Sequence, residues 1–315
     1  MCKERQQGRF ELPEEVLLSS QLASITATTA GTVRLGGEVT VNRLGFGAMR
    51  ITGPGIWGPP KDREAAKAVL RRAVELDVNF IDTADSYGPG VSEELIAEAL
   101  YPYLKGLIIA TKGGWRRPGP NQWTHDSSPS HLREAIEGSL KRLRLDRISV
   151  YQLHTPDPAI SFEASIEALV RLQTEGKIHL IGLSNVTLEH LERAQKMATI
   201  ASVQNRYSVF DREWEHVLSY CEKNRIAFIP WFPLGAGGVG HPLLNRIAQA
   251  HNVKPLQVAL AWLLERSPFM LPIPGTSSVE HLEENIATAG LRLSDEEYRQ
   301  LDVVNGATSA GRVRG

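Results

Sequence analysis

Short apolar segments alternate with longer amphipathic ones through most of this chain, and this alternation limits the fold more than any other feature. The eight apolar segments are residues 44–49, 79–82, 107–111, 148–154, 177–184, 201–205, 227–230 and 270–275. Such short segments, apolar on both faces, predict parallel strands covered by helices. Eight strand–helix units in a chain of 315 residues predict an α/β fold, the closed (β/α)8 TIM barrel.

The segments between the predicted strands have the periodicity of amphipathic helices. In residues 62–77, the apolar side chains of Ala66, Val69, Leu70 and Ala73 fall on one helical stripe. An open doubly wound sheet would show the same alternation of strands and helices. That fold would need a glycine-rich nucleotide-binding turn after its first strand, and the glycines that follow residue 44 do not have the required spacing.

The two ends of the chain depart from the repeating pattern. We expect an N-terminal extension at residues 1–30, a barrel domain at residues 31–305 and a C-terminal tail at residues 306–315. Two short strand-like segments surround Gly36 and Gly37, and this pattern predicts a β-hairpin ahead of the first barrel strand.

Composition narrows the environment and the partners. The chain has 35 Lys and Arg against 36 Asp and Glu, so we expect neither a nucleic acid nor an anionic membrane as a partner. No run of about 18 apolar residues predicts a membrane span, and the first 15 residues are too charged for a signal peptide. Its two cysteines, Cys2 and Cys221, suit a reducing compartment. We therefore expect a cytoplasmic protein; the oligomeric state stays open.

Polar residues follow three consecutive predicted strands. Asp82 and Tyr87 come after the second strand, Lys112 after the third and His154 at the end of the fourth. One such residue in a loop commonly serves as a helix cap or a packing contact. The active sites of TIM barrels lie at the carboxyl ends of the strands, so these four side chains should meet on one rim. Their convergence predicts an active site.

The four residue types suit proton transfer to an oxygen atom. A free tyrosine has a pKa near ~10, and a neighbouring ammonium lowers that pKa. Lys112 can take this part, Asp82 can hold Lys112 in an ion pair, and His154 can orient a substrate oxygen. Tyr87 then serves as proton donor to a carbonyl or acceptor from an alcohol. Neither a nucleophilic Ser–His or Cys–His pair nor a metal-binding HExxH motif is evident, so we expect no metal.

Six motifs resemble the aldo-keto reductase superfamily, in the order and spacing of that family. They are IDTADSYG (81–88), ATKGG (110–114), YQLHTPD (151–157), KIHLIGLSN (177–185), VQNRY (203–207) and IPGTSSVEHLEEN (273–285). The resemblance implies that Asp82, Tyr87, Lys112 and His154 form the family's catalytic tetrad. The segment GPPKDREAA (58–66) further resembles a bacterial subgroup that includes pyridoxal reductases.

The resemblance also implies a nicotinamide cofactor extended across the barrel mouth. The residues that match its binding site are Ser184, Asn185, Gln204, Trp231, Phe232, Pro233, Leu234, Gly235, Gly275, Thr276, Ser277, His281, Glu284 and Asn285. Many relatives have Lys-Ser where this chain has Gly275-Thr276, and an Arg where it has His281. We expect NADPH, with its 2′-phosphate held by Ser277 and a helix N-terminus, and tolerance of NADH.

The substrate should be a small carbonyl compound. Candidate substrate-binding residues on the loops of the rim are Trp57, Tyr207, Met49, Arg50 and Trp123. The predicted function is reversible NADPH-dependent reduction of an aldehyde or ketone to an alcohol, with Tyr87 as general acid. Two alternatives remain open: a redox-sensing regulatory barrel with slow turnover, and an alcohol dehydrogenase that works mainly in the oxidative direction.

Overall fold

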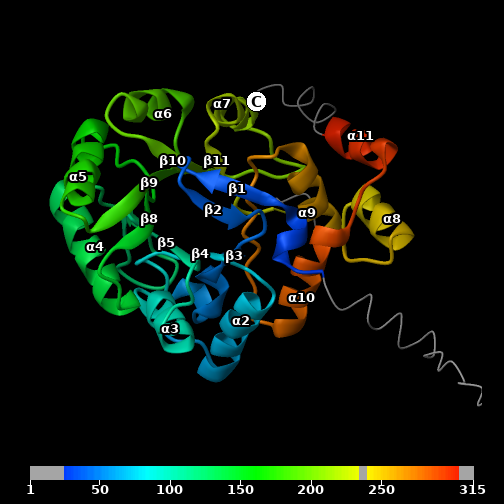
Figure 1. Ribbon diagram of the computed structural model, residues 1–315, viewed down its shortest axis with the longest axis horizontal. Coiled ribbons are helices and arrows are strands. Elements are labelled where there is room, and N and C mark those ends of the chain that lie inside the picture. Colours follow the sequence, from blue (N-terminus) through cyan, green and yellow to red (C-terminus); the bar gives the residue numbers. More distant parts are fainter. Residues whose placement is uncertain (1–24, 234–239, 305–315) are drawn as a thin grey trace, which may run out of the picture.

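Seven parallel strands form one curved sheet in the computed structural model, which describes residues 25–233 and 240–304 (Figure 1). The sheet order is β11-β10-β9-β8-β5-β4-β3. The strands are β3 (Phe46–Gly47), β4 (Phe80–Asp82), β5 (Ile108–Gly113), β8 (Ile148–Leu153), β9 (Ile178–Ser184), β10 (Ile200–Gln204) and β11 (Ala227–Phe228).

An extended segment at residues 269–273 closes the sheet into a barrel. Leu271 N donates to Phe228 O on one side, and Gly45 N donates to Pro272 O on the other, both at 2.9 Å. The predicted (β/α)8 barrel is confirmed. The eighth predicted strand makes a single β-bridge, between Phe228 and Met270, because Pro272 and Pro274 have no N–H to continue a ladder.

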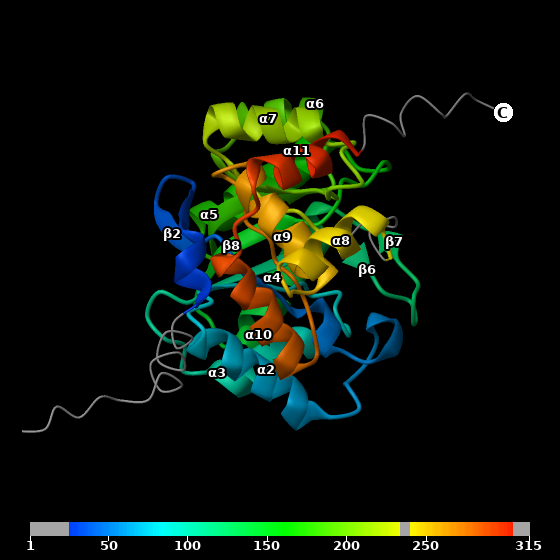
Figure 2. The same ribbon diagram turned by 90° about the vertical axis from the view of Figure 1, so that its right-hand side faces the viewer.

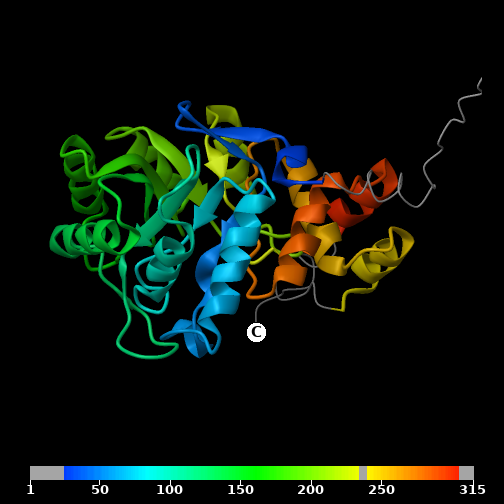
Figure 3. The same ribbon diagram turned by 60° about the horizontal axis from the view of Figure 1, so that its bottom comes forward.

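Ten α-helices of the described residues surround the sheet (Figures 1 and 3). They are α2 (Arg63–Glu75), α3 (Val91–Leu100), α4 (Pro129–Leu143), α5 (Phe162–Thr174), α6 (Leu188–Gln195), α7 (Glu215–Asn224), α8 (Pro242–Ala250), α9 (Pro255–Arg266), α10 (Val279–Ala287) and α11 (Asp295–Val303). The stripe predicted for the first helix is buried as expected on α2, which begins after the Asp62 cap. Helix α11 was not predicted; it packs against the outer core through Leu301.

A β-hairpin, β1 (Thr32–Leu35) and β2 (Val39–Asn42), closes one end of the barrel. Gly36 and Gly37 make its turn with φ of 58° and 75°, values that glycine adopts without steric cost. The hairpin side chains share a core cluster with the first inward residues of the strands. That cluster includes Val33, Leu35, Val41, Phe80, Ala110, Val150, Leu180, Ala201 and Ala227. Figure 2 shows this hairpin and the second one, β6 (Trp115–Arg116) with β7 (Thr124–His125), at opposite ends of the molecule.

The interior of the barrel changes from apolar to polar along the strands. Residues two apart on a strand face the same side. The residue two positions after each apolar residue of this cluster therefore also points into the barrel, at its open end. The pairs are Phe80 and Asp82 on β4, Ala110 and Lys112 on β5, and Val150 and Gln152 on β8. Because the hairpin covers the amino ends of the strands, a site can form at their carboxyl ends.

Candidate active site

A buried ion pair forms the floor of the open end. Lys112 Nζ on β5 lies 2.5 Å from Asp82 Oδ1 on β4, and it also donates to Thr83 O at 2.8 Å. Both side chains are almost fully buried. Burial lowers the pKa of Lys112, but Asp82 and Tyr87 outweigh this effect and leave that pKa raised. Lys112 therefore carries a positive charge at neutral pH.

Two amide side chains complete the surroundings of Asp82. Gln152 Nε2 and Gln204 Nε2 both donate to Asp82 Oδ2 at 2.9 Å. With Lys112 on the other oxygen, the carboxylate has three donors, as a buried carboxylate requires. Gln204 was predicted as a cofactor-binding residue. Gln152 was not predicted, although its alternation with Tyr151 on β8 makes it inward-facing.

Tyr87 lies in the loop between β4 and α3, with 7% of its surface exposed. Lys112 Nζ is 5.3 Å from the centre of its ring. Burial raises the pKa of Tyr87, and the charge of Lys112 acts against this rise. Lys112 thus has the expected direction of effect, but the net pKa is raised rather than lowered because burial is the larger contribution. The phenol therefore holds its proton at neutral pH.

His154 follows β8 and packs edge-on against Tyr87, with ring centres 5.8 Å apart. Its Nδ1 lies 3.5 Å from Ser86 Oγ. Burial, together with the charge of Lys112, holds the pKa of His154 well below its usual value. The neutral imidazole has one N–H to offer a substrate oxygen.

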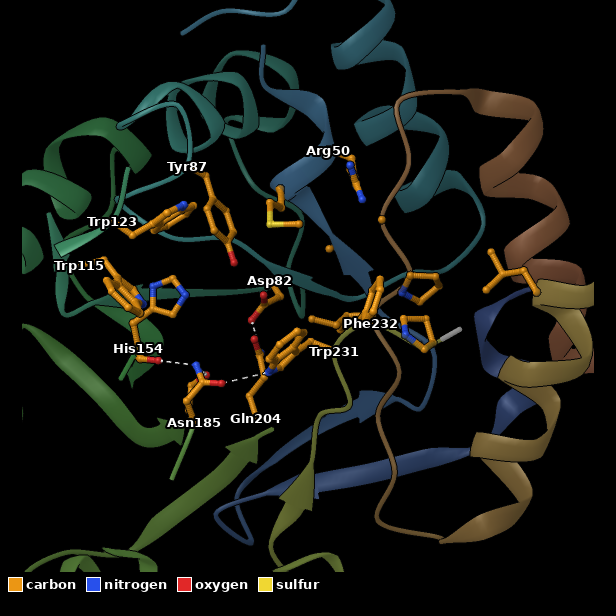
Figure 4. Close-up of a pocket in the computed structure, with 18 residues that line it drawn as sticks. Arg50, Asp82, Tyr87, Trp115, Trp123, His154, Asn185, Gln204, Trp231 and Phe232 are labelled. Atoms are coloured by element: carbon orange, nitrogen blue, oxygen red, sulfur yellow. Dashed lines mark hydrogen bonds between the residues drawn. The ribbon is translucent and has the colours of Figure 1, made fainter. Parts of the chain in front are cut away.

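Asp82, Tyr87, His154 and Gln204 line a cavity of about 660 Å³, drawn in Figure 4. Ser184, Asn185 and Trp231 also line the cavity. Asn185 has a left-handed backbone (φ 56°), which asparagine tolerates. Its side-chain amide donates to His154 O at 3.0 Å and accepts from Trp231 Nε1 at 3.2 Å. This bridge ties the end of β9 to the loops on either side of it.

The cavity continues toward the N-terminus of α10. Gly275 lines it, and a Cβ on Gly275 would lie 2.4 Å from Gly47 O, so only glycine permits this approach. Ser278 caps α10 by accepting from the backbone N–H of His281, whose side chain is exposed.

The remaining predicted cofactor residues are distributed as follows. Phe232 and Pro233 line the cavity. Thr276 and Asn285 are buried, and Ser277 is exposed. Glu284 pairs with Lys254 at 3.9 Å. Leu234 and Gly235 lie outside the described residues.

The structure separates the five predicted substrate residues. Met49, Arg50 and Trp123 line the cavity, with Arg50 on the side of residues 273–275 and Trp123 on the side of Tyr87 (Figure 4). Trp57 is half-buried outside the lining. Tyr207 is fully buried; its ring packs against Phe228 and its hydroxyl donates to Glu215. Tyr207 is therefore a core residue, and its place in the substrate site is corrected.

Trp115 is a lining residue that sequence reasoning missed. It lies 6.4 Å from His154 between ring centres and stacks on His125 at 4.2 Å. Its position directly after the motif at residues 110–114 was the available signal, because a residue following a strand-end motif shares its rim.

Neither a metal centre nor a membrane-crossing element is found in residues 25–233 and 240–304. No three His, Cys, Asp or Glu side chains there gather into a group that could hold a metal ion. No helix in these ranges combines the length and the apolar character needed to cross a bilayer.

The fold and the pocket together define a class of protein: (β/α)8 barrels with ionisable side chains gathered in a cavity at the carboxyl ends of the strands. The chain belongs to the Aldo/keto reductase family, whose sequence profile matches residues 43–305. The expected extension and tail boundaries stay predictions.

Two curated relatives are similar over nearly their whole length. An uncharacterised oxidoreductase of Schizosaccharomyces pombe is 49% identical, covering 89% of this chain and 92% of the relative. Pyridoxine 4-dehydrogenase of Escherichia coli is 44% identical, covering 85% of this chain and 96% of the relative. An aldo-keto reductase from Klebsiella pneumoniae, solved in complex with NADPH, superposes with a TM-score of 0.75 at 28% identity, covering 87% and 94% of the two chains.

Proposed function

We propose that this protein is an NADPH-dependent reductase that interconverts an aldehyde or ketone and its alcohol. The observation that carries the proposal is that Asp82, Tyr87 and His154 line one cavity, with the buried ammonium of Lys112 behind the protonated phenol. The family membership and the NADPH complex of the Klebsiella relative support it. The reducing compartment we expect for the chain is the cytoplasm.

The residues of the cavity fit a nicotinamide cofactor. Trp231 offers an aromatic face, and Ser184, Asn185 and Gln204 gather amide and hydroxyl groups that suit a ring carboxamide. Gly47 and Gly275 line the cavity without side chains, so a pyrophosphate can approach their backbone. The capped N-terminus of α10 presents free N–H groups of the kind that bind phosphate.

When bound, NADPH supplies a hydride for the carbonyl carbon. Tyr87 gives its phenolic proton to the carbonyl oxygen, and His154 donates a hydrogen bond that orients the same oxygen. Lys112 stabilises the phenolate left behind, and Asp82 with its two glutamine donors keeps Lys112 in place. In the reverse direction the phenolate accepts the proton of the alcohol.

For the substrate we propose pyridoxal, reduced to pyridoxine. The relative from Escherichia coli is named for the reverse reaction, and the cavity next to Tyr87 is walled by aromatic side chains, Trp115 and Trp123. A flat heteroaromatic ring gains from stacking against such a wall. The named direction of that relative also supports the oxidation of the alcohol as a second candidate function.

The test is a turnover assay on the full chain in both directions. Pyridoxal with NADPH, and pyridoxine with NADP⁺, should be turned over, as measured by the change in cofactor absorbance. Benzaldehyde and propanal serve as comparison substrates. Rates with NADH establish how strict the cofactor choice is. NADPH binding without turnover of any carbonyl or alcohol would instead support the redox-sensing alternative.

A further inference from the structure

We propose that Arg117 is a positioning residue that sets the preference of this enzyme for flat aromatic aldehydes. It lies outside the cavity lining and acts through Trp123 and through the loop that carries Tyr87. The inference rests on the proposed carbonyl reductase function and deepens it, because it names the substrate class and the residue that selects it.

The guanidinium of Arg117 joins three loops of the rim by hydrogen bonds to backbone carbonyls. Nη1 donates to Ser86 O at 2.8 Å, directly next to Tyr87, and to Ile56 O at 2.9 Å. Nη2 donates to Gly55 O at 3.0 Å, and Nε donates to Gln122 O at 2.8 Å. One side chain therefore fixes the loops that follow β3, β4 and β5 relative to one another.

The same guanidinium covers an aromatic ring of the cavity wall. Arg117 Cζ lies 3.7 Å from the ring centre of Trp123, a distance at which a cation is attracted to an indole face. Trp123 in turn meets Trp115 edge-on at 5.8 Å. Figure 4 shows both tryptophans with His154 on the Tyr87 side of the cavity. Arg117 thus holds the wall beside the expected position of the reacting carbonyl.

The joined loops contain backbone that needs such support. Ile56 and Asn121 both have φ of 55°, and a β-branched residue in this region is strained unless its surroundings hold it. Arg117 binds the carbonyl of Ile56, and Asn121 N donates to Gly55 O at 3.3 Å. The wall is therefore held by contacts between loops, with Arg117 at their centre.

Arg117 is used differently from its neighbour Arg116. Arg116 is half-exposed and forms surface ion pairs with Asp126 and Glu134. Within the described ranges, Arg117 pairs with no carboxylate, and burial lowers its pKa. A lysine could not replace it, because four carbonyls at these angles need the planar fork of donors.

The test compares two substrates in two pairs of variants. Arg117→Met and Arg117→Lys should raise KM for pyridoxal by about tenfold or more, the effect of about 1.4 kcal/mol of lost binding. The kcat for pyridoxal should change less, and KM for propanal, too small to span the wall, should stay within about twofold. Arg116→Met and Arg116→Lys are the matched controls and should leave both substrates unchanged.

A binding measurement makes the result independent of turnover. Pyridoxine cannot transfer a hydride to the reduced cofactor, so its calorimetric titration into the NADPH complex reports binding alone. The Arg117 variants should show the same loss of pyridoxine affinity, with NADPH affinity unchanged. An equal loss for pyridoxal and propanal, or no loss for either, would overturn the proposal. If Arg117→Met fails to fold, Arg117→Lys and Trp123→Leu carry the comparison. Absence of turnover in the unmodified enzyme would refute the proposed function, while the titration would still test Arg117.

Discussion

The floor and the wall of the pocket are built by different means. On the floor, Asp82, Lys112, Gln152 and Gln204 sit near the ends of the parallel strands β4, β5, β8 and β10 and bond to one another through their side chains. On the wall, the loops meet through backbone carbonyls gathered by Arg117.

Because of this difference, we expect the reaction chemistry to depend on the floor and the substrate selectivity to depend on the wall. Strand register fixes the positions of the floor residues, so the Lys112–Asp82 ion pair is insensitive to changes in the loops. The wall has no such framework, and a change in a few loop residues can reshape it while the fold persists. Substitutions on the floor should therefore affect kcat for all substrates, and substitutions in the wall should affect KM for some of them.

The largest effect is expected where the floor meets the substrate. Tyr87→Phe removes the phenolic proton and keeps the ring, so turnover of every carbonyl should fall by about 10²–10⁴, the range for a lost general acid. NADPH affinity, measured by fluorescence titration, should stay the same. A variant with half of the normal rate in single-turnover experiments would remove Tyr87 from the reaction.

The next effect tests the pairing on the floor. Lys112→Met should abolish most of the turnover and lower the free energy of unfolding by about 3–5 kcal/mol, because Asp82 is left buried without its cation. The double variant Lys112→Met/Asp82→Asn should regain part of that stability, measured by denaturant unfolding, but no activity. Additive losses would show that the two residues are not coupled.

The sequence allowed prediction of the floor far better than of the wall. Asp82, Lys112 and Gln204 lie at or near the ends of recognisable strands, and the period of two along each strand gives their direction. Gln152, in the same position on β8, was not selected. The positions of Trp115 and Tyr207 depend on long loops and on core packing, which periodicity does not encode. Trp115 was therefore missed, and Tyr207 was wrongly placed in the pocket.

A smaller effect concerns the support behind the Tyr87 loop. Burial and the negative charge of Glu93 raise the pKa of Asp85 to about 8, against the opposing charge of Arg142. Between about pH 4 and pH 8 the folded chain thus keeps a proton that the unfolded chain has lost, so this group's contribution to stability falls as the pH rises.

Replacing Asp85 should remove that pH dependence. The unfolding free energy of Asp85→Asn relative to the unmodified protein should rise by up to about 1.4 kcal/mol per pH unit across the window and become constant above about pH 8. Denaturant unfolding at several pH values measures the difference. Asp146→Asn, at an exposed carboxylate, is the control; the same slope in both variants would contradict a partly buried, protonated Asp85.

The smallest expected effect lies at the far end of the pocket, away from both the floor residues and the loops that Arg117 joins. His281 is exposed at the third position of α10, where relatives of the family often have Arg. Because Arg can hold a phosphate with two hydrogen bonds, His281→Arg should tighten NADPH by about tenfold, roughly one charge-assisted hydrogen bond, and leave NADH unchanged. Fluorescence titration of both cofactors measures this, with exposed His216→Arg as control; equal gains for NADPH and NADH would mean that His281 does not contact the 2′-phosphate.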